Sequence, residues 1–339
     1  MLRVTAYTGG KDVPSARFRV RQYIPALGRM GIQVNEAPAR FGSYPPAART
    51  LRPAWGVLAL AERFYAALGS RDTDVTFLQR EMLSTFASVE RFTKPPRILD
   101  VDDAIWLLRG GQAAISLARC CEMVICGNEF IADFFSRYAP NVVVLPTPVD
   151  TRRFCPAQGD RDPRVICWSG TSSGLPFLYS IEQALAAVLA GAPERRLRVV
   201  CDTAPRFSKV RPEQVMFVPW SETVEVAAIQ DAGVAIMPLD DSPWSRGKCS
   251  YKLLTYMSCG VPVVATPVGM NGDLLSRAPA GFGARTKAEW TDALERILSS
   301  PAGGAMGAAG RQLVERDYSL SALSPRMAGI LTAVAAGRN

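Results

Sequence analysis

Residues 246–269 read RGKCSYKLLTYMSCGVPVVATPVG, and this stretch decides the fold class. Leu253, Tyr256 and Met257 have the spacing of one helix face, and Gly260 is a typical residue for ending a helix. The apolar run PVVAT at 262–266 then predicts a buried strand. A short helix that runs through a glycine into a buried strand predicts an α/β protein with a parallel sheet.

Strand-like and helical runs alternate on both sides of this stretch, in two series separated by a Pro-, Asp- and Arg-rich segment. The strand-like runs lie at 2–7, 32–37, 74–79, 97–103, 123–127 and 142–146, and then at 164–170, 197–202, 215–220, 233–239, 262–266 and 281–284. We therefore expect two doubly wound, Rossmann-like parallel-sheet domains that face each other across a cleft. The expected bounds are 1–150 and 164–320, with a linker at 151–163. Residues 321–339 are expected to form a C-terminal helix that packs back towards the N-terminal domain.

The composition excludes several kinds of chemistry. The chain has no histidine, which excludes His general bases, His-dependent nucleophilic triads and His-ligated metals. Its eight cysteines contain no C-x-x-C pair, so we expect neither a disulfide framework nor a zinc cluster. The net charge of +8 favours an anionic ligand or surface, but no nucleic-acid-binding signature is present. No run is long and apolar enough for a membrane span, and we expect a cytoplasmic protein.

Three cations gather where the helix of the opening stretch is expected to begin. Arg246, Lys248 and Lys252 would stand at its N-terminus, and Lys248 and Lys252 would share one helix face. Cations there are unfavourable unless an anion compensates them, so this arrangement predicts a bound phosphate or diphosphate. The alternative is that Arg246 and Lys248 simply pair with Asp240 and Asp241.

A second phosphate-binding candidate is the turn GTSSG at 170–174, between a predicted strand and a predicted helix. Backbone N–H groups of Thr171 and Ser172 could face a phosphate, although such turns also use glycine for geometry alone. The pair Gly247-Lys248 is not a P-loop, because the required upstream glycine is Ser242.

The N-terminal half offers candidates of its own at predicted strand ends. Gly9 and Gly10 follow the first strand, and Arg17 lies on the helix after them. Arg17 is either part of a solvated helix face or part of a cationic rim for an anionic acceptor or membrane surface. Asp102 and Asp103 end another strand; we favour a substrate-side or structural role for them over a metal site.

Four segments together resemble the large retaining glycosyltransferase family 4, whose members have the two-domain GT-B fold. They are KLLTYMSCGVPVVATPVGMNG, NVVVLPTPVDTRRFCP, VICWSGTSSGLPFL and SARFRVRQYIPALGRMGI. The resemblance covers most of the chain. It implies transfer of a sugar, with retention at the anomeric carbon, from a nucleotide-diphosphate-sugar in the second domain to an acceptor against the first, without a metal or other cofactor.

The resemblance also implies roles for particular residues. Arg246, Lys248 and Lys252 would stabilise the leaving diphosphate. The donor would be bound by a further set, namely Gly170, Thr171, Ser172, Gly247, Cys249, Ser250 and Thr255. The acceptor side would be formed by Gly9, Gly10, Arg17, Asp102 and Asp103. The acceptor would be a saccharide or a lipid-linked glycan, as in polysaccharide biosynthesis, with peripheral contact to the anionic inner face of the membrane.

This sequence departs from the family pattern at two positions. The family commonly has two glutamates here, and the matching positions are Gly247 and Thr255. Two alternatives therefore stay open: a catalytically silent homologue that acts as a binding partner, and a nucleotide-sugar epimerase of the same fold. The sequence indicates neither the sugar, the nucleobase, the acceptor nor the oligomeric state.

Overall fold

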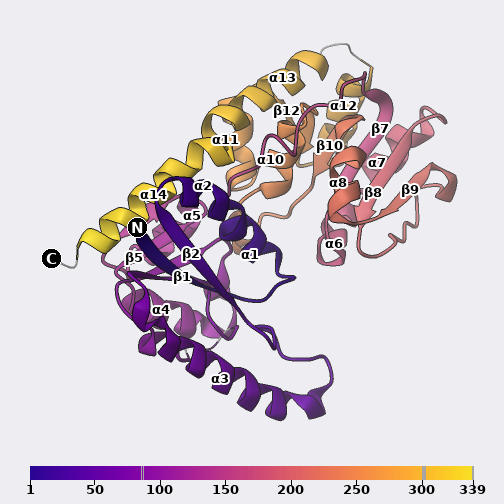
Figure 1. The fold of residues 1–339 in the computed structure, drawn as a ribbon. Coiled ribbons are helices and arrows are strands. Elements are labelled where there is room, and N and C mark those ends of the chain that lie inside the picture. Colours follow the sequence, from indigo (N-terminus) through magenta and orange to yellow (C-terminus); the bar gives the residue numbers. More distant parts are fainter. Residues whose placement is uncertain (85, 87, 300–302, 338–339) are drawn as a thin grey trace. The chain divides into compact units, whose positions relative to one another are not determined.

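The computed structural model describes residues 1–84, 86, 88–299 and 303–337, and the chain forms two compact units (Figure 1). The first unit contains Met1–Pro148, Gly247–Cys249 and Leu320–Asn339. The second contains Val149–Arg246 and Ser250–Ser319. Segment 151–163, which we expected to be a linker, is thus part of the second unit, where Phe154 is buried.

The first unit has one six-stranded sheet in the order β2-β1-β3-β4-β5-β6, in which every pair is parallel. Its strands are β1 (Leu2–Thr8), β2 (Ile32–Pro38), β3 (Val75–Gln79), β4 (Arg97–Val101), β5 (Met123–Cys126) and β6 (Val142–Val144). Its α-helices are α1 (Pro14–Arg19), α2 (Ile24–Arg29), α3 (Arg52–Leu68), α4 (Gln112–Arg119), α5 (Glu129–Phe135) and α14 (Leu320–Ala336). Its 3₁₀ turns are η1 (Arg21–Tyr23), η2 (Arg49–Leu51), η3 (Gly69–Asp72), η4 (Glu90–Phe92), η5 (Ile105–Leu107) and η6 (Arg109–Gly111).

The second unit has another parallel six-stranded sheet, in the order β12-β11-β10-β7-β8-β9. Its strands are β7 (Asp162–Ser169), β8 (Arg196–Cys201), β9 (Val215–Pro219), β10 (Ala232–Met237), β11 (Val263–Ala265) and β12 (Gly281–Gly283). Its α-helices are α6 (Leu175–Ser180), α7 (Glu182–Ala190), α8 (Glu222–Gln230), α9 (Pro243–Arg246), α10 (Tyr251–Ser258), α11 (Met270–Arg277), α12 (Lys287–Leu298) and α13 (Gly303–Leu313). The shorter turns are η7 (Ser172–Gly174), η8 (Pro212–Gln214) and η9 (Val314–Tyr318).

The prediction of two doubly wound parallel sheets is confirmed, and each predicted strand is present. Each sheet reverses its direction of growth once. In the first sheet β2 lies on one side of β1 and β3 on the other, and in the second sheet β8 and β10 flank β7. Ligands of such sheets bind at the carboxyl ends of the strands, at this reversal point. Ligand-binding positions are therefore expected at the ends of β1 and β3 and at the ends of β7 and β10.

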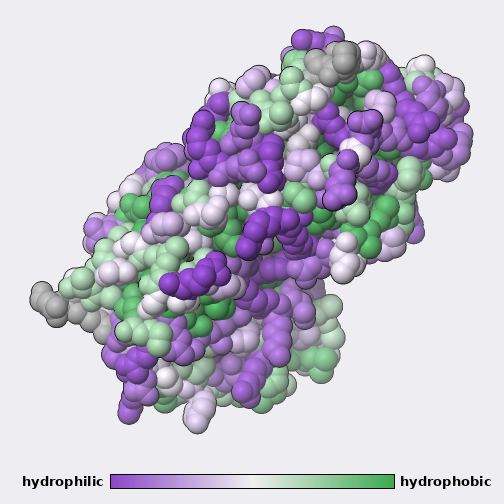
Figure 2. Space-filling model, turned by 45° about the horizontal axis from the view of Figure 1, so that its top comes forward, coloured by the Kyte–Doolittle hydropathy of each residue, from purple (hydrophilic) through white to green (hydrophobic). Residues whose placement is uncertain are grey.

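The C-terminal helix α14 belongs to the core of the first unit. Leu323, Met327 and Leu331, each four residues from the next, are buried against the sheet residues Val4 and Phe77. A second core forms around β7, β8 and the helices α7 and α12 of the second unit. The hydrophobic residues drawn in Figure 2 reach the surface mostly in small groups between hydrophilic ones.

Among the described residues, no single helix has both the length and the apolar character needed to cross a membrane. The bent pair Ser172–Ser180 and Glu182–Ala190 reaches that length only when its two halves are taken together. Leu178, Leu185 and Val188 of this pair are completely buried in the core of the second unit.

Candidate functional site

Polar residues of the first unit gather at the carboxyl ends of neighbouring strands. β1 leads into Gly9 and Gly10, β3 leads into Arg80, and β4 leads into Asp102 and Asp103. Because parallel strands end at the same edge of a sheet, residues that are distant in sequence meet here.

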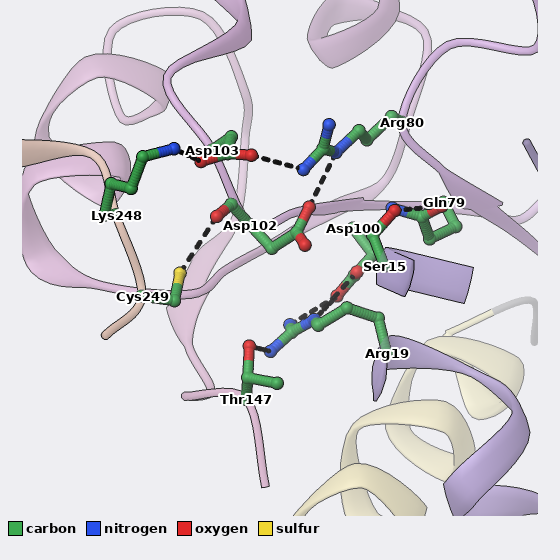
Figure 3. A network of polar contacts seen from close by, with 10 residues as sticks. All are labelled: Ser15, Arg19, Gln79, Arg80, Asp100, Asp102, Asp103, Thr147, Lys248 and Cys249. Carbon is green, nitrogen blue, oxygen red and sulfur yellow. Dashed lines mark hydrogen bonds and ion pairs between the residues drawn. The ribbon is translucent and has the colours of Figure 1, made fainter. Parts of the chain in front are cut away.

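Arg80 is the centre of an ion network at this edge (Figure 3). Its Nε donates to Asp102 Oδ1 at 2.6 Å and its Nη2 donates to Asp103 Oδ2 at 2.7 Å. Burial alone would lower the pKa of Arg80, but these carboxylates raise it above its ordinary value. Burial would likewise raise the pKa of Asp102, and the Arg80 guanidinium lowers it instead. Arg80 thus forms an ion pair with each of the two carboxylates, and this pairing argues against the alternative that Asp102 and Asp103 bind a metal ion.

The segment Gly247–Cys249 packs into the same edge (Figure 3). Lys248 Nζ donates to Asp103 Oδ1 at 3.2 Å, and Asn128 Nδ2 donates to the Lys248 carbonyl at 3.1 Å. Cys249 Sγ lies 3.1 Å from the Asp102 carbonyl oxygen. The alternative that Lys248 pairs with Asp240 or Asp241 is therefore wrong, because the carboxylate partner of Lys248 is Asp103, which follows β4.

Close approach explains the glycine at 247. A Cβ at this position would lie 2.6 Å from the Ala104 Cβ, so no side chain fits without movement. Gly127 is restricted in the same way, because its Cβ would lie 2.1 Å from Cys249 Sγ. The family resemblance leads one to expect a glutamate at this position, but the packing leaves no room for a side chain there.

A buried ion pair supports this edge from below. Arg19 Nε donates to Asp100 Oδ2 at 3.0 Å, and Arg19 Nη1 donates to the Leu145 carbonyl at 2.8 Å. Both side chains are fully buried. Burial also raises the pKa of Cys249 well above its ordinary value, so this residue is a neutral thiol.

Gly9 and Gly10 line a cavity of about 830 Å³ in the first unit, together with Glu36 and Glu62. Arg21 Nε donates to Glu36 Oε2 at 2.7 Å and fixes that carboxylate. The other predicted acceptor-side residues lie elsewhere: Asp102 and Asp103 belong to the ion network, and the Arg17 guanidinium lies 4.5 Å from the centre of the Phe18 ring.

The reversal point of the second sheet places a lysine at the predicted phosphate turn. The Lys252 ammonium lies 4.8 Å from the centre of the Trp168 ring, at the end of β7. A Cβ at Gly170 would lie 2.5 Å from Lys252 Nζ and 2.6 Å from the Trp168 ring. Gly170 therefore lets the ammonium and the indole approach the turn Gly170–Gly174, and the three residues form one compact cationic corner.

Asp202 determines the shape of that turn. Its carboxylate accepts the Ser172 N–H at 2.6 Å and the Ser172 hydroxyl at 3.0 Å. Burial would raise the pKa of Asp202, but the hydrogen bonds from Cys201 and Ser172 lower it. The Thr171 hydroxyl lies 2.8 Å from the Ser173 hydroxyl. The Ser172 N–H, which we expected to face a phosphate, is thus directed to a carboxylate.

The expected continuous helix over the opening stretch is wrong. The helix α9 ends at Arg246 and α10 begins at Tyr251, so neither Arg246 nor Lys248 stands at a helix N-terminus. Residues 247–249 between them are not helical, and Ser250, the N-cap of α10, has a left-handed conformation with φ 48° and ψ 30°. Arg246 Nε donates to Asp241 Oδ1 at 2.8 Å, as the pairing alternative stated. The hydrogen bond from Arg246 lowers the pKa of Asp241.

Ser250 and Thr255, two predicted donor ligands, are turned into the second unit. Ser250 Oγ donates to Asn271 Oδ1 at 2.7 Å and the residue is buried. Thr255 is 2% exposed, and its hydroxyl donates to the Lys252 carbonyl of its own helix at 2.7 Å. The Thr255 hydroxyl, which was predicted to bind the donor, is therefore bonded to its own helix in this structure.

Sequence reasoning missed Arg80, Trp168 and Asp202. Each stands at or next to the carboxyl end of a predicted strand, which is the signal that could have found them. The network at Arg80 was missed because its partners, Asp102 and Asp103, come from another strand.

Comparisons with known proteins agree with this architecture. Residues 169–300 match the family model described as glycosyl transferases group 1. No protein of curated function is similar enough in sequence to be recognised as a relative.

Solved structures match over nearly the whole chain. Anabaena Alr3699/HepE in complex with UDP-glucose has a TM-score of 0.71 at 13% identity, covering 98% of this chain and 100% of that one. The α,α-trehalose 6-phosphate synthase from Burkholderia multivorans has a TM-score of 0.70 at 14% identity, covering 99% and 98%. AviGT4, a glycosyltransferase involved in avilamycin A biosynthesis, has a TM-score of 0.65 at 14% identity, covering 99% of both chains.

At these identities the likeness establishes the fold, which is the GT-B fold expected from the sequence. The part of the chain that matches the glycosyl transferases group 1 model, residues 169–300, contains Gly170 and Lys252 of the cationic corner.

Proposed function

We propose that the protein is a retaining, metal-independent glycosyltransferase that moves a sugar from a nucleotide-diphosphate-sugar to a saccharide or lipid-linked acceptor. One observation carries the proposal. Lys252 places its ammonium beside the Gly170 turn, at the reversal point of the sheet in the segment that matches the group 1 family. A neighbour of the same fold, HepE, has been crystallised with UDP-glucose.

The proposed reaction needs no histidine. The bond between the anomeric carbon and the diphosphate oxygen breaks, and an acceptor oxygen bonds to the same face of that carbon. The acceptor proton passes to the leaving diphosphate. A fixed ammonium such as that of Lys252 stabilises the negative charge that develops on the leaving group.

The assignments to individual residues follow their surroundings. Lys252 and Gly170 have the strongest support as donor-binding residues, with Thr171 beside them. Arg246 and Lys248 each have a carboxylate partner, Asp241 and Asp103, which weakens their assignment to the diphosphate. On the acceptor side the cavity at Gly9 and Gly10 has the strongest support.

The remaining assignments come from the family resemblance and the charge of the chain. We propose a location in the cytoplasm, at or near the inner face of the membrane, and a role in building a polysaccharide. The net charge of +8 suits a diphosphate donor and an anionic surface.

A thermal-shift panel of nucleoside diphosphates and nucleotide-sugars, with and without EDTA, tests the proposal. A ligand at 100 times its dissociation constant should stabilise the fold by about 2.7 kcal/mol. The shift should persist in EDTA, disappear in Lys252→Met and persist in Lys287→Met, a matched change at an exposed lysine of α12. Loss of the shift in EDTA would contradict metal independence.

A second candidate function is a catalytically silent homologue that acts as a binding partner. It is favoured by one specific observation: Gly247 has no room for a side chain, and Thr255 is buried with its hydroxyl bonded to its own helix. At the two positions where the resembled family commonly has glutamate, the chain therefore has no side chain that could take over the role of a carboxylate. A complete panel without any thermal shift would favour this candidate over the transferase.

A further inference from the structure

Helix α3 of the first unit turns a charged residue inward and its apolar residues outward. Its buried residues are Ala59, Arg63 and Ala67, and Arg63 is almost completely buried. From position 53 to its end, its exposed residues are all apolar or aromatic: Pro53, Ala54, Val57, Leu58, Leu60, Ala61, Phe64, Tyr65 and Leu68. We call these nine residues the α3 outer face. A surface helix of a globular protein normally has the opposite arrangement.

The orientation of α3 is fixed by polar contacts on its inner side. Arg63 Nη1 donates to the Ala37 carbonyl at 3.0 Å, and Arg63 Nη2 donates to the Thr8 carbonyl at 3.2 Å. Tyr7 Oη donates to the Ala66 carbonyl at 2.8 Å. The helix is thus held at the ends of β1 and β2 by its arginine, and its apolar side is left outside.

The α3 outer face is large and strongly exposed. Val57 is 70% exposed, Leu58 52% and Tyr65 82%. Phe92 of η4 extends the face, since its ring meets that of Phe64 edge-on at a centroid distance of 5.4 Å. Such a surface normally binds something.

Exposed arginines stand at both ends of the face. Arg49 and Arg52 lie at its beginning, Arg71 follows its end, and Arg91 adjoins Phe92. The exposed acidic residue beside them is Asp72. The rim therefore carries a clear excess of positive charge.

We propose that the α3 outer face binds peripherally to an anionic lipid bilayer, with the helix lying in the plane of the interface. The apolar half enters the boundary of the acyl chains, and the arginines at both ends reach lipid phosphates. Charge distinguishes this partner from a second copy of the chain. A two-fold contact through the same face would bring the arginine-rich rims together.

The placement has a consequence for substrate access, which rests on the proposed function. Glu62 and Ala66 of α3 also line the cavity at Gly9 and Gly10. A bilayer against the outer side of the helix would hold this cavity within one helix diameter of the lipid headgroups, roughly 10 Å. An acceptor with a lipid anchor could then enter without leaving the membrane.

Vesicle flotation of the purified full chain tests the proposal. The vesicles are phosphatidylcholine, alone or with 30% phosphatidylglycerol. We expect binding to the anionic vesicles that weakens with salt, and at least tenfold weaker binding by the triple variant Val57→Ser/Leu58→Ser/Tyr65→Ser. Arg49→Gln/Arg71→Gln/Arg91→Gln should lose about fivefold per arginine.

Matched changes on the second unit serve as controls. They are Met216→Ser/Phe217→Ser/Val224→Ser for the apolar set and Arg206→Gln/Lys209→Gln/Arg211→Gln for the charged set. Both should bind the vesicles more tightly than the corresponding α3 variants. Failure of the wild type to float with anionic vesicles at low salt would overturn the proposal. So would a wild-type dimer that the α3 serine variant converts to a monomer.

The nucleotide panel separates this proposal from the proposed function. Nucleotide binding without vesicle binding would contradict membrane binding by the α3 outer face but not the proposed transferase function. Vesicle binding without nucleotide binding would contradict the transferase function but not membrane binding by this face.

Discussion

The two sheets have the same kind of topology but end in different chemistry. At the edge of the first sheet the cations Arg80 and Lys248 are matched by the carboxylates Asp102 and Asp103. At the reversal point of the second sheet the cation Lys252 lies against an aromatic ring beside a glycine turn. An aromatic face attracts a cation without neutralising its charge. The first edge thus pairs its cations with carboxylates of the chain, whereas the second holds its lysine against an indole, where we propose that it meets the donor diphosphate.

The largest effect is expected when the buried ion pair beneath the first edge loses its cation. Arg19→Met leaves the Asp100 carboxylate buried without its cation, which should lower the free energy of unfolding by about 3–5 kcal/mol. Urea unfolding measures this. Arg164→Met removes an exposed partner of Asp162 and should hardly move the midpoint. Equal effects of the two variants would contradict the proposed role of the buried pair.

The second prediction compares the two lysines directly. Lys252→Met keeps the length of the side chain but removes its charge, and turnover should fall by about 10²–10³-fold. Lys248→Met should cost less than about tenfold, because Asp103 already compensates that charge. Steady-state kinetics with the donor identified by the thermal-shift panel measures both. A larger loss of turnover in Lys248→Met than in Lys252→Met would contradict the assignment of Lys252, rather than Lys248, to the leaving diphosphate.

A smaller effect is expected at the glycine of the first edge. Gly247→Ala places a Cβ 2.6 Å from the Ala104 Cβ and should lower the free energy of unfolding by about 1–3 kcal/mol. Gly28→Ala is the matched control, since a Cβ there meets nothing within 4 Å. That control should be neutral or stabilising by about 0.4–1 kcal/mol. An undisturbed Gly247→Ala protein would show that the segment Gly247–Cys249 is loosely held.

The smallest signal is a pH dependence. The pKa of Asp102 is lowered in the folded state, so its pairing stabilises the fold above the ordinary aspartate pKa of about 3.9. That contribution is lost as the pH falls through the lowered value. The difference in unfolding free energy between the wild type and Arg80→Gln should thus be smaller at pH 3 than at pH 7. A difference that grows on acidification would contradict the assignment.

The sheets could be predicted from the sequence because buried parallel strands, such as β10, leave an unmistakable apolar run. The candidate site could be predicted only in part. Lys252 and Gly170 were singled out because each belongs to a local motif, and the structure brings them together, while their role in binding a donor stays a prediction. The break between α9 and α10 was not predicted, because the local sequence does not reveal that Gly247 lies against Ala104, more than a hundred residues away in the sequence.

The course of the chain has a practical consequence for building chimaeras. The polypeptide changes unit at Pro148–Val149, Arg246–Gly247, Cys249–Ser250 and Ser319–Leu320. Cutting once near position 150 would remove Leu323, Met327 and Leu331 from the first core, and it would leave the pocket for Cys249 unfilled. An exchange of the second unit between proteins of this fold should therefore transplant residues 149–319 as an insert between 148 and 320, while keeping the host's own version of 247–249. The second unit is thus largely an insertion in the chain of the first, and chimaeras should be designed for an inserted domain rather than for two consecutive domains.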